Sequence, residues 1–103
     1  MTADDRFDTR IDVQTYRPAA IKKAAYRVAE RCTVRLEPSD SDEPILRFTF
    51  PPRTSDTAAA EAVRVFYQEL LDEELRAQLH EETDALRSLI LAHAFSRTDL
   101  LQR

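Results

Sequence analysis

The clearest hydrophobic pattern in the chain lies in its C-terminal half, between Glu69 and Ser96. Apolar positions recur there at intervals of three, four and seven residues, which is the spacing of the apolar stripe of an amphipathic helix. Neither proline nor glycine interrupts the segment. The pattern therefore predicts a helix with one buried face. The stripe consists of Leu71, Leu75, Leu79, Leu86, Leu89, Ile90 and His93.

A single unbroken helix through this region would be too long for a compact domain. A rod over residues 56–94 would measure about 58 Å at roughly 1.5 Å per residue, whereas a domain of this size has a radius of gyration of about 13 Å. The short side chains of Asp72 and Thr83 can each accept a hydrogen bond from a free first-turn N–H. We therefore expect a break near Leu71–Asp72, with Glu82–Thr83 as the alternative.

The N-terminal half shows the two-residue alternation that is typical of β-strands with one polar face. A helix is expected over Ala19–Arg31, where Pro18 suits the first turn. Seven turn-type residues, Pro38–Pro44, join the last two strands and favour an antiparallel hairpin. The strands are expected at residues 7–15, 32–37 and 45–50.

The order of elements predicts an α/β two-layer (α+β) domain, β-α-β-β-α-α, with a small three-stranded sheet and helices on one of its faces. The third strand is the most aromatic and is placed in the centre. Residues 1–103 are expected to form a single domain, with a frayed N-terminus (1–6) and a short tail (98–103). Thr54, Ser55 or Asp56 is expected to cap the helix after the sheet. Its buried stripe is expected to be Ala59, Ala62, Val63, Phe66, Tyr67, Leu70 and Leu71.

The composition argues against several classes of function. The chain contains no glycine, so it has no glycine-rich loop for binding phosphate groups. Its net charge of −4 counts against nucleic-acid binding. Basic residues do cluster early in the chain, but their expected place is a solvated helix face. They are Arg17, Lys22, Lys23, Arg27 and Arg31.

The single cysteine, Cys32, excludes an intramolecular disulfide and fits a reducing compartment. Its position on the inward face of a strand predicts an inert, buried thiol. The chain does not begin with a basic and then apolar leader, and its most apolar run, Ser88–Ala92, is too short to span a bilayer. A cytoplasmic location without membrane contact is expected.

No group of residues has the spacing of a catalytic or metal site. His80 and His93 are thirteen positions apart, or about 220° around a continuous helix, and cannot share a metal ion there. His80 is expected on the surface and His93 in the core. Glu73 and Glu74 are adjacent, as are Glu81 and Glu82. The two side chains of each pair point about 100° apart on a helix, which does not suit general acid/base chemistry. No catalytic residue, metal or cofactor is expected, and the protein is not expected to be an enzyme.

Two arginines of the C-terminal helix are candidates for binding a partner. Arg76 and Arg87 are eleven positions apart and return to within about 20° of one another, with Thr83 on the same face. Together they could grip a carboxylate or an acidic partner. The alternative is that each pairs with a nearby acidic residue of its own helix, Asp72 or Asp84.

The segment Leu86–Phe95 is apolar around most of its circumference. A helix of this kind is buried on more than one side, and a small sheet covers only part of it. Leu91 and Phe95 are therefore expected to bind a partner chain, identical or not.

Two segments carry a resemblance to a known family. AAIKKAAYRVAERCTVRLEP, residues 19–38, and LLDEELRAQLHEETDALRSLILAHAFS, residues 70–96, are similar to the HxsD family of small proteins from His-Xaa-Ser systems. The resemblance extends over about residues 10–97. It is most specific at Leu70-Leu71, Leu75-Arg76, Thr83, Arg87, Leu89-Ile90 and Ala94-Phe95-Ser96.

That family occurs beside radical-SAM proteins and a peptide with His-Xaa-Ser repeats. The resemblance implies a non-catalytic accessory role in maturing a ribosomally made peptide, with the radical-SAM protein, the precursor peptide or both as partners. The chain has neither a three-cysteine cluster motif nor a His-Xaa-Ser repeat, so it is neither the radical enzyme nor the precursor. An extended leader peptide could add to the edge of strand 32–37. The alternatives are a homodimeric structural protein without a peptide ligand and a small enzyme acting through its acidic helix.

Overall fold

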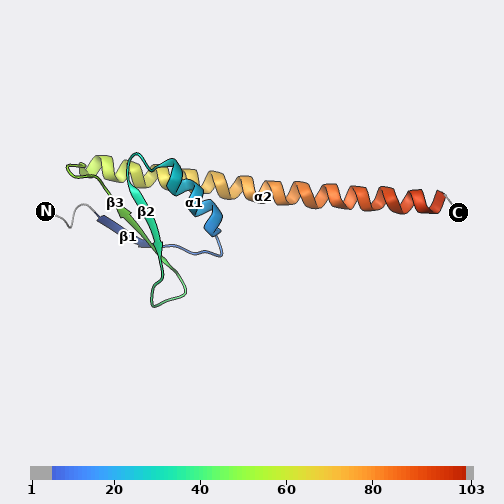
Figure 1. Cartoon of the computed structure of the whole chain (residues 1–103), viewed down its shortest axis with the longest axis horizontal. Helices are drawn as coiled ribbons and strands as arrows, with labels where there is room; N and C mark the ends of the chain where they lie inside the picture. The colour runs from blue at the N-terminus through green and yellow to red at the C-terminus, as the bar shows by residue number, and fades with distance from the viewer. Residues whose placement is uncertain (1–5, 102–103) are drawn as a thin grey trace.

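The structure is a computed structural model that describes the backbone of residues 6–101 and the side chains of residues 6–96. Two helices cover one face of a three-stranded sheet, and the second helix extends far beyond it (Figure 1). The predicted α+β class is confirmed, with one helix fewer than expected. The elements are β1 (Arg6–Arg10), α1 (Pro18–Arg27), β2 (Thr33–Glu37), β3 (Ile45–Thr49) and α2 (Asp56–Leu101).

The sheet has the order β1-β3-β2, so β3 lies in the centre as predicted. Both neighbours run antiparallel to β3, and β2 and β3 form the expected hairpin. The inward side chains of β3, Leu46 and Phe48, are fully buried. On the open face Arg47 bridges both edge strands, with Nε 3.2 Å from Oδ1 of Asp8 and Nη1 2.9 Å from Oε1 of Glu37. This polar face explains why helices cover one side only.

Strand β1 ends at Arg10, well before the predicted end at residue 15. The carboxylate of Asp12 accepts hydrogen bonds from the backbone N–H of Gln14 at 2.8 Å and from the hydroxyl of Thr15 at 2.9 Å. The side chain therefore closes a local turn in place of continuing the ladder. Polar and apolar residues continue to alternate through this turn, and for that reason the sequence predicted a longer strand.

The core forms where the two helices meet the sheet. Ala20 and Ala24 of α1 are buried and allow a close approach. Phe66 of α2 packs edge-on against Phe48 of β3, with ring centroids 5.1 Å apart. Pro18 opens α1 as predicted. Helix α2 begins after Ser55, whose Oγ accepts the backbone N–H of Ala58 at 3.0 Å, so Ser55 is the cap among the three candidates.

Helix α2 is continuous over 46 residues, so the expected break near Leu71–Asp72 is wrong, as is the alternative at Glu82–Thr83. At about 1.5 Å per residue the helix is roughly 69 Å long. The chain measures 78 × 29 × 14 Å with a radius of gyration of 20.6 Å, far from compact. Asp72 does not cap a new helix, because its carboxylate accepts the Arg76 Nε–H at 2.9 Å within α2. Residues 98–101 continue the helix.

The apolar surface of α2 changes sides near Leu70. The buried positions Ala62, Phe66 and Leu70 face the sheet. The following leucines lie roughly 180° around the helix from this row. They therefore face away from the sheet, and Leu71, predicted to be buried, is 49 % exposed. All six aliphatic side chains of the predicted C-terminal stripe are at least that exposed.

The buried row of α2 should carry most of the stability of the globular part. Phe66→Ala removes a fully buried ring and is expected to lower the free energy of unfolding by about 3–5 kcal/mol. The control Tyr26→Ala changes a side chain that is 84 % exposed, and its effect should stay within about 0.5 kcal/mol. Urea unfolding monitored by circular dichroism measures both, and equal effects would contradict this assignment of the core.

Candidate functional site

The segment around α1 fixes α2 at the point where it leaves the sheet. Arg17, immediately before α1, donates its backbone N–H to Oε1 of Glu74 at 3.0 Å. The Arg17 guanidinium also reaches Oε2 of Glu74 at 3.1 Å and Oε2 of Glu81 at 2.8 Å. One side chain therefore ties the start of α1 to two positions of α2 that are about two turns apart.

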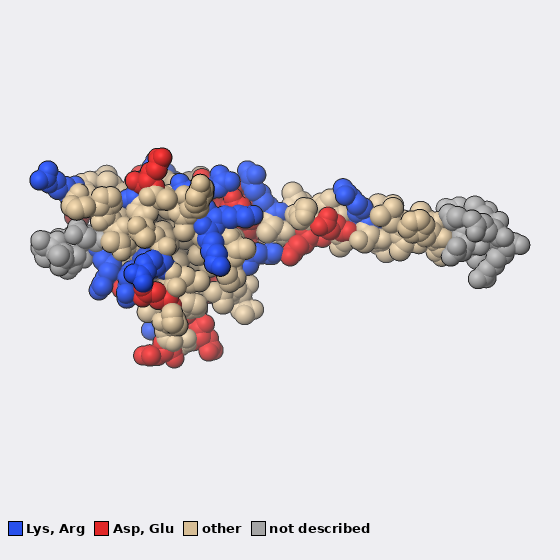
Figure 2. Space-filling view, viewed as in Figure 1, with Lys and Arg blue, Asp and Glu red and all other residues tan. Residues whose placement is uncertain are grey.

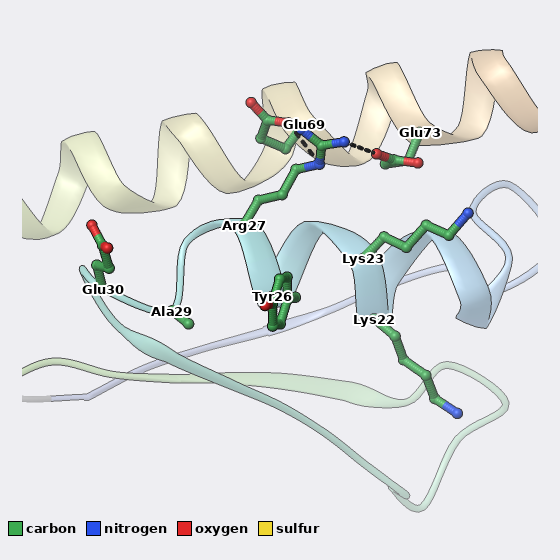
Figure 3. Close-up of a pocket in the computed structure, with 8 residues that line it drawn as sticks. All are labelled: Lys22, Lys23, Tyr26, Arg27, Ala29, Glu30, Glu69 and Glu73. Carbon is green, nitrogen blue, oxygen red and sulfur yellow. Dashed lines mark ion pairs between the residues drawn. The ribbon is translucent and has the colours of Figure 1, made fainter.

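A second arginine makes a matching contact at the other end of α1. Arg27 Nη2 lies 2.9 Å from Oε2 of Glu73, and its Nε lies 3.5 Å from Oε1 of Glu69 (Figure 3). We call Arg17, Arg27, Glu73 and Glu74 the anchor. It holds the long helix against α1 at both ends of the short one.

The two carboxylates of the anchor are buried, with Glu73 6 % and Glu74 5 % exposed. The backbone N–H of Arg17 lowers the pKa of Glu74, and the Arg17 side chain lowers it further, while burial acts in the opposite direction. Hydrogen bonds to Glu81 and Glu74 raise the pKa of Arg17. The contact between Arg17 and Glu74 is therefore an ion pair at neutral pH.

Sequence reasoning missed the anchor. Arg17 and Arg27 were predicted to lie on a solvated face, but both reach across to carboxylates of α2. A signal was present, because Glu73 and Glu74 follow Leu70 by three and four positions and so fall on the buried row. Charged residues on a buried row require charged partners.

A shallow depression runs along α1 beside the anchor. Figure 3 shows that its side chains diverge: Arg27 reaches α2, whereas Lys22 and Tyr26 point away from it. These groups do not converge on a common point where a substrate could be held. The lining residues are Lys22, Lys23, Tyr26, Arg27, Ala29, Glu30, Glu69 and Glu73.

Among the residues that the structure describes, no three His, Cys, Asp or Glu side chains are grouped so that they could hold a metal ion. Over the same part of the chain, no helix has the length and apolar character needed to cross a membrane. Cys32 is buried, and burial raises the pKa of its thiol. This placement agrees with an inert packing role.

The two histidines both lie on the exposed surface of α2. His80 was predicted there, and its Nε2 is 3.2 Å from Oδ2 of Asp84. His93 was predicted in the core, and this is wrong because the stripe on which it lies faces away from the sheet. A continuous helix also keeps the two rings on different faces.

The predicted binding residues form one row on the projecting part of α2. Because the helix is unbroken, these positions lie on one side of it and are spread over about 120° of its circumference. Leu91 is 49 % and Phe95 68 % exposed. We call this row the arginine strip, and all five of its members are exposed: Arg76, Thr83, Arg87, Leu91 and Phe95.

The two arginines of the strip differ in their contacts. Arg76 pairs with Asp72 at 2.9 Å, which is the intrahelical alternative considered from the sequence. Among the described residues Arg87 makes no ion pair, so its guanidinium remains available to a partner. Charged side chains gather over the globular part and thin out along the projecting helix (Figure 2).

A second exposed row lies on a different face of the same segment. We call it the leucine stripe. It is formed by Leu75, Leu79, Leu86, Leu89 and Ile90, which are 54–67 % exposed. No segment of residues 6–101 packs over it. The projecting helix therefore presents two separate exposed surfaces, and the arginine strip contributes the apolar side chains Leu91 and Phe95.

The anchor should contribute measurably to stability. Arg17→Ala removes the guanidinium that pairs with the buried Glu74, while the backbone N–H of residue 17 stays, and it is expected to lower the free energy of unfolding by about 1–3 kcal/mol. The matched control is Arg64→Ala, which removes an exposed ion pair within α2 and should change it by less than about 0.5 kcal/mol. Chemical unfolding of both variants decides the matter, and similar losses would show that the anchor is an ordinary surface pair.

The anchor also predicts a pH dependence. The pKa of Glu74 is lower in the folded chain than the ordinary value of 4.5. Such a carboxyl stabilises the fold when the pH lies above its ordinary pKa. This contribution is lost as pH falls through the folded pKa. Glu74→Gln should therefore be less stable at pH 7, and its stability should fall less than that of the wild type between pH 5 and pH 3. Parallel curves in thermal unfolding would contradict this reasoning.

Comparisons with known proteins agree with the resemblance seen in the sequence. No curated protein and no solved structure matches the chain. The family described as "His-Xaa-Ser system protein HxsD" matches residues 11–101, which include β3, the anchor and the whole of α2. The chain therefore belongs to the HxsD family of His-Xaa-Ser system proteins.

Proposed function

We propose that this protein is a non-catalytic accessory subunit for maturation of a ribosomally made peptide, and that it binds the radical-SAM protein of its system through the arginine strip. The observation that carries the proposal is the projecting part of α2. It holds apolar side chains in water, with Phe95 68 % exposed, and no described part of the chain covers them. A large exposed apolar surface on a monomer is typical of a binding site.

The strip has the chemistry of a protein interface. Arginine and large aromatic residues are enriched among the positions that dominate binding energy. Arg87 and Phe95 supply these two types eight residues apart, with Leu91 between them on the same row. A row of anchors at intervals of four residues suits a helix that lies in a groove of its partner. Arg87 favours an acidic residue or carboxylate at the rim of that groove.

The anchor supports this role by holding the helix in a fixed direction. In proteins most of the stability of a helix comes from packing rather than from intrinsic propensity. The contacts of Glu73 and Glu74 with Arg17 and Arg27 fix the middle turns of α2 against α1, so the strip beyond them is presented in one orientation. Preorganisation of this kind lowers the entropic cost of binding.

The precursor peptide is the second partner that we propose. Strand β2 lies at an edge of the sheet, and its residues Thr33–Glu37 can pair with an added strand. The arginine strip and this edge are on different elements, so both partners could be held at once. We place the protein in the cytoplasm, since the lone buried thiol of Cys32 suits a reducing compartment.

Copurification with the untagged radical-SAM protein of the same system tests the main proposal. The complex should form with the wild type and be lost with Leu91→Asp or Phe95→Asp, since each puts a charge into the buried part of the interface. Arg87→Ala should weaken the complex about tenfold or more, as expected for a charged hydrogen bond.

The control is Tyr26→Asp, an equally drastic change at a side chain on α1 that is 84 % exposed. It should leave the complex intact. Unchanged binding by the Leu91→Asp and Phe95→Asp variants, or absence of any complex with the wild type, would refute the proposal. Unfolding of these variants would assign the two residues to a core instead.

A further inference from the structure

We propose that the leucine stripe pairs two copies of this chain through an antiparallel contact of their α2 helices. The inference goes beyond the binding role above, because it uses a different face of the helix. It rests on the exposure of the stripe, on the spacing of its residues and on two polar residues that lie on the same line of the helix, Glu82 and His93.

The stripe is large enough to form a specific interface. Its five aliphatic side chains are 54–67 % exposed, which amounts to roughly 100 Å² of apolar surface for each. Two copies would together remove about 1,000 Å² from water by these side chains alone, near the lower bound for a specific protein interface. Flanking residues add to this area.

The spacing of the stripe is that of a two-helix seam. Leu75, Leu79, Leu86 and Leu89 follow one another at intervals of four, seven and three residues. These intervals keep all four on one line of a pair of supercoiled helices. The same line includes Glu82, His93 and Ser96. The seam therefore contains two titratable residues, both of them exposed in the single chain.

These two residues decide the orientation. In a parallel pair each residue meets its own copy, so Glu82 would face Glu82 of the partner subunit and His93 would face the partner subunit's His93. Two carboxylates that face each other at such a position oppose association. An antiparallel pair centred between Leu86 and Leu89 instead places Glu82 opposite the partner's His93, and does so twice by symmetry. A carboxylate accepts a hydrogen bond from an imidazole N–H, so both groups find a partner.

The rest of the seam fits the same register. Leu86 meets Leu89 of the partner subunit on both sides of the centre, and Leu79 meets the partner's Ser96. Ala85 and Ala92, which border the seam, would lie opposite one another and allow a close approach of the backbones. Small residues beside a helix seam have this effect.

The globular parts do not obstruct this pairing. The sheet packs on the side of α2 that carries Ala62, Phe66 and Leu70, roughly 180° from the seam. In an antiparallel pair the two globular parts lie at opposite ends. Leu91 and Phe95 lie on the far side of the helix and stay exposed in the dimer, so the arginine strip remains open to another partner.

Sedimentation equilibrium of the full chain tests the pairing. The wild type should be a dimer at micromolar concentration, and Leu86→Asp should be a monomer. The matched control, Leu91→Asp, introduces the same charge five residues further along the same helix but on the other face, and it should remain a dimer. Near-ultraviolet circular dichroism of the Phe48–Phe66 cluster confirms that both variants keep the folded globular part. A monomeric wild type, or a dimer that survives Leu86→Asp, overturns the proposal.

A charge exchange tests the orientation. Glu82→Lys and His93→Glu should each weaken the dimer about tenfold or more, and the double variant should return to within about threefold of the wild type, since each lysine then faces a glutamate. In a parallel pair each position meets its own copy. The double variant would then bring two lysines together at position 82 and two glutamates together at position 93, so it would not recover. A double variant as weak as the single ones therefore overturns the proposal. Copurification with the radical-SAM protein is measured separately, so either idea can fail alone.

Discussion

The shape of this protein depends on the burial of two adjacent carboxylates in α2. Glu73 and Glu74 lie on the buried face of α2 at the point where the helix leaves the sheet. Each is held by an arginine from one end of α1. Removing a carboxylate from water is unfavourable unless it is paired. The pairing therefore fixes both where α1 lies and the direction in which α2 continues. Beyond these residues α2 has no further support from the sheet.

The side chains that the long helix presents change along its length. Its first turns bury Phe66 and Leu70 against the sheet, the middle turns use Glu73 and Glu74, and the distal turns carry two exposed apolar rows. A helix that served only its own domain would keep a single apolar face. The change of face near Leu71 separates the part that folds the chain from the part that we propose binds other molecules.

Much of the globular part could be predicted from the sequence. Two-residue alternation located β2 and β3, and the aromatic content of β3 placed it in the centre. The end of β1 was missed because the turn at Asp12 depends on a side-chain hydrogen bond that alternation does not reveal. The helix break was wrong because it assumed a compact domain. An apolar stripe has the same spacing whether a segment of the same chain or another chain covers it. For this reason the sequence also predicted, wrongly, that Leu71 and His93 are buried in the single chain. The alignment of Arg76 and Arg87 was predictable, since it follows from helix geometry alone.

A continuous helix attached at one end also behaves as a lever. Phe95 lies 21 positions beyond Glu74, or about 32 Å along the axis. A tilt of 10° at the attachment would move this ring by about 6 Å, a shift comparable to the rise of one turn of the helix. Small changes in the contacts of Arg17 and Arg27 would thus be amplified at the tip. Conversely, a partner that grips the tip exerts a large torque on the short α1 and on the sheet beneath it.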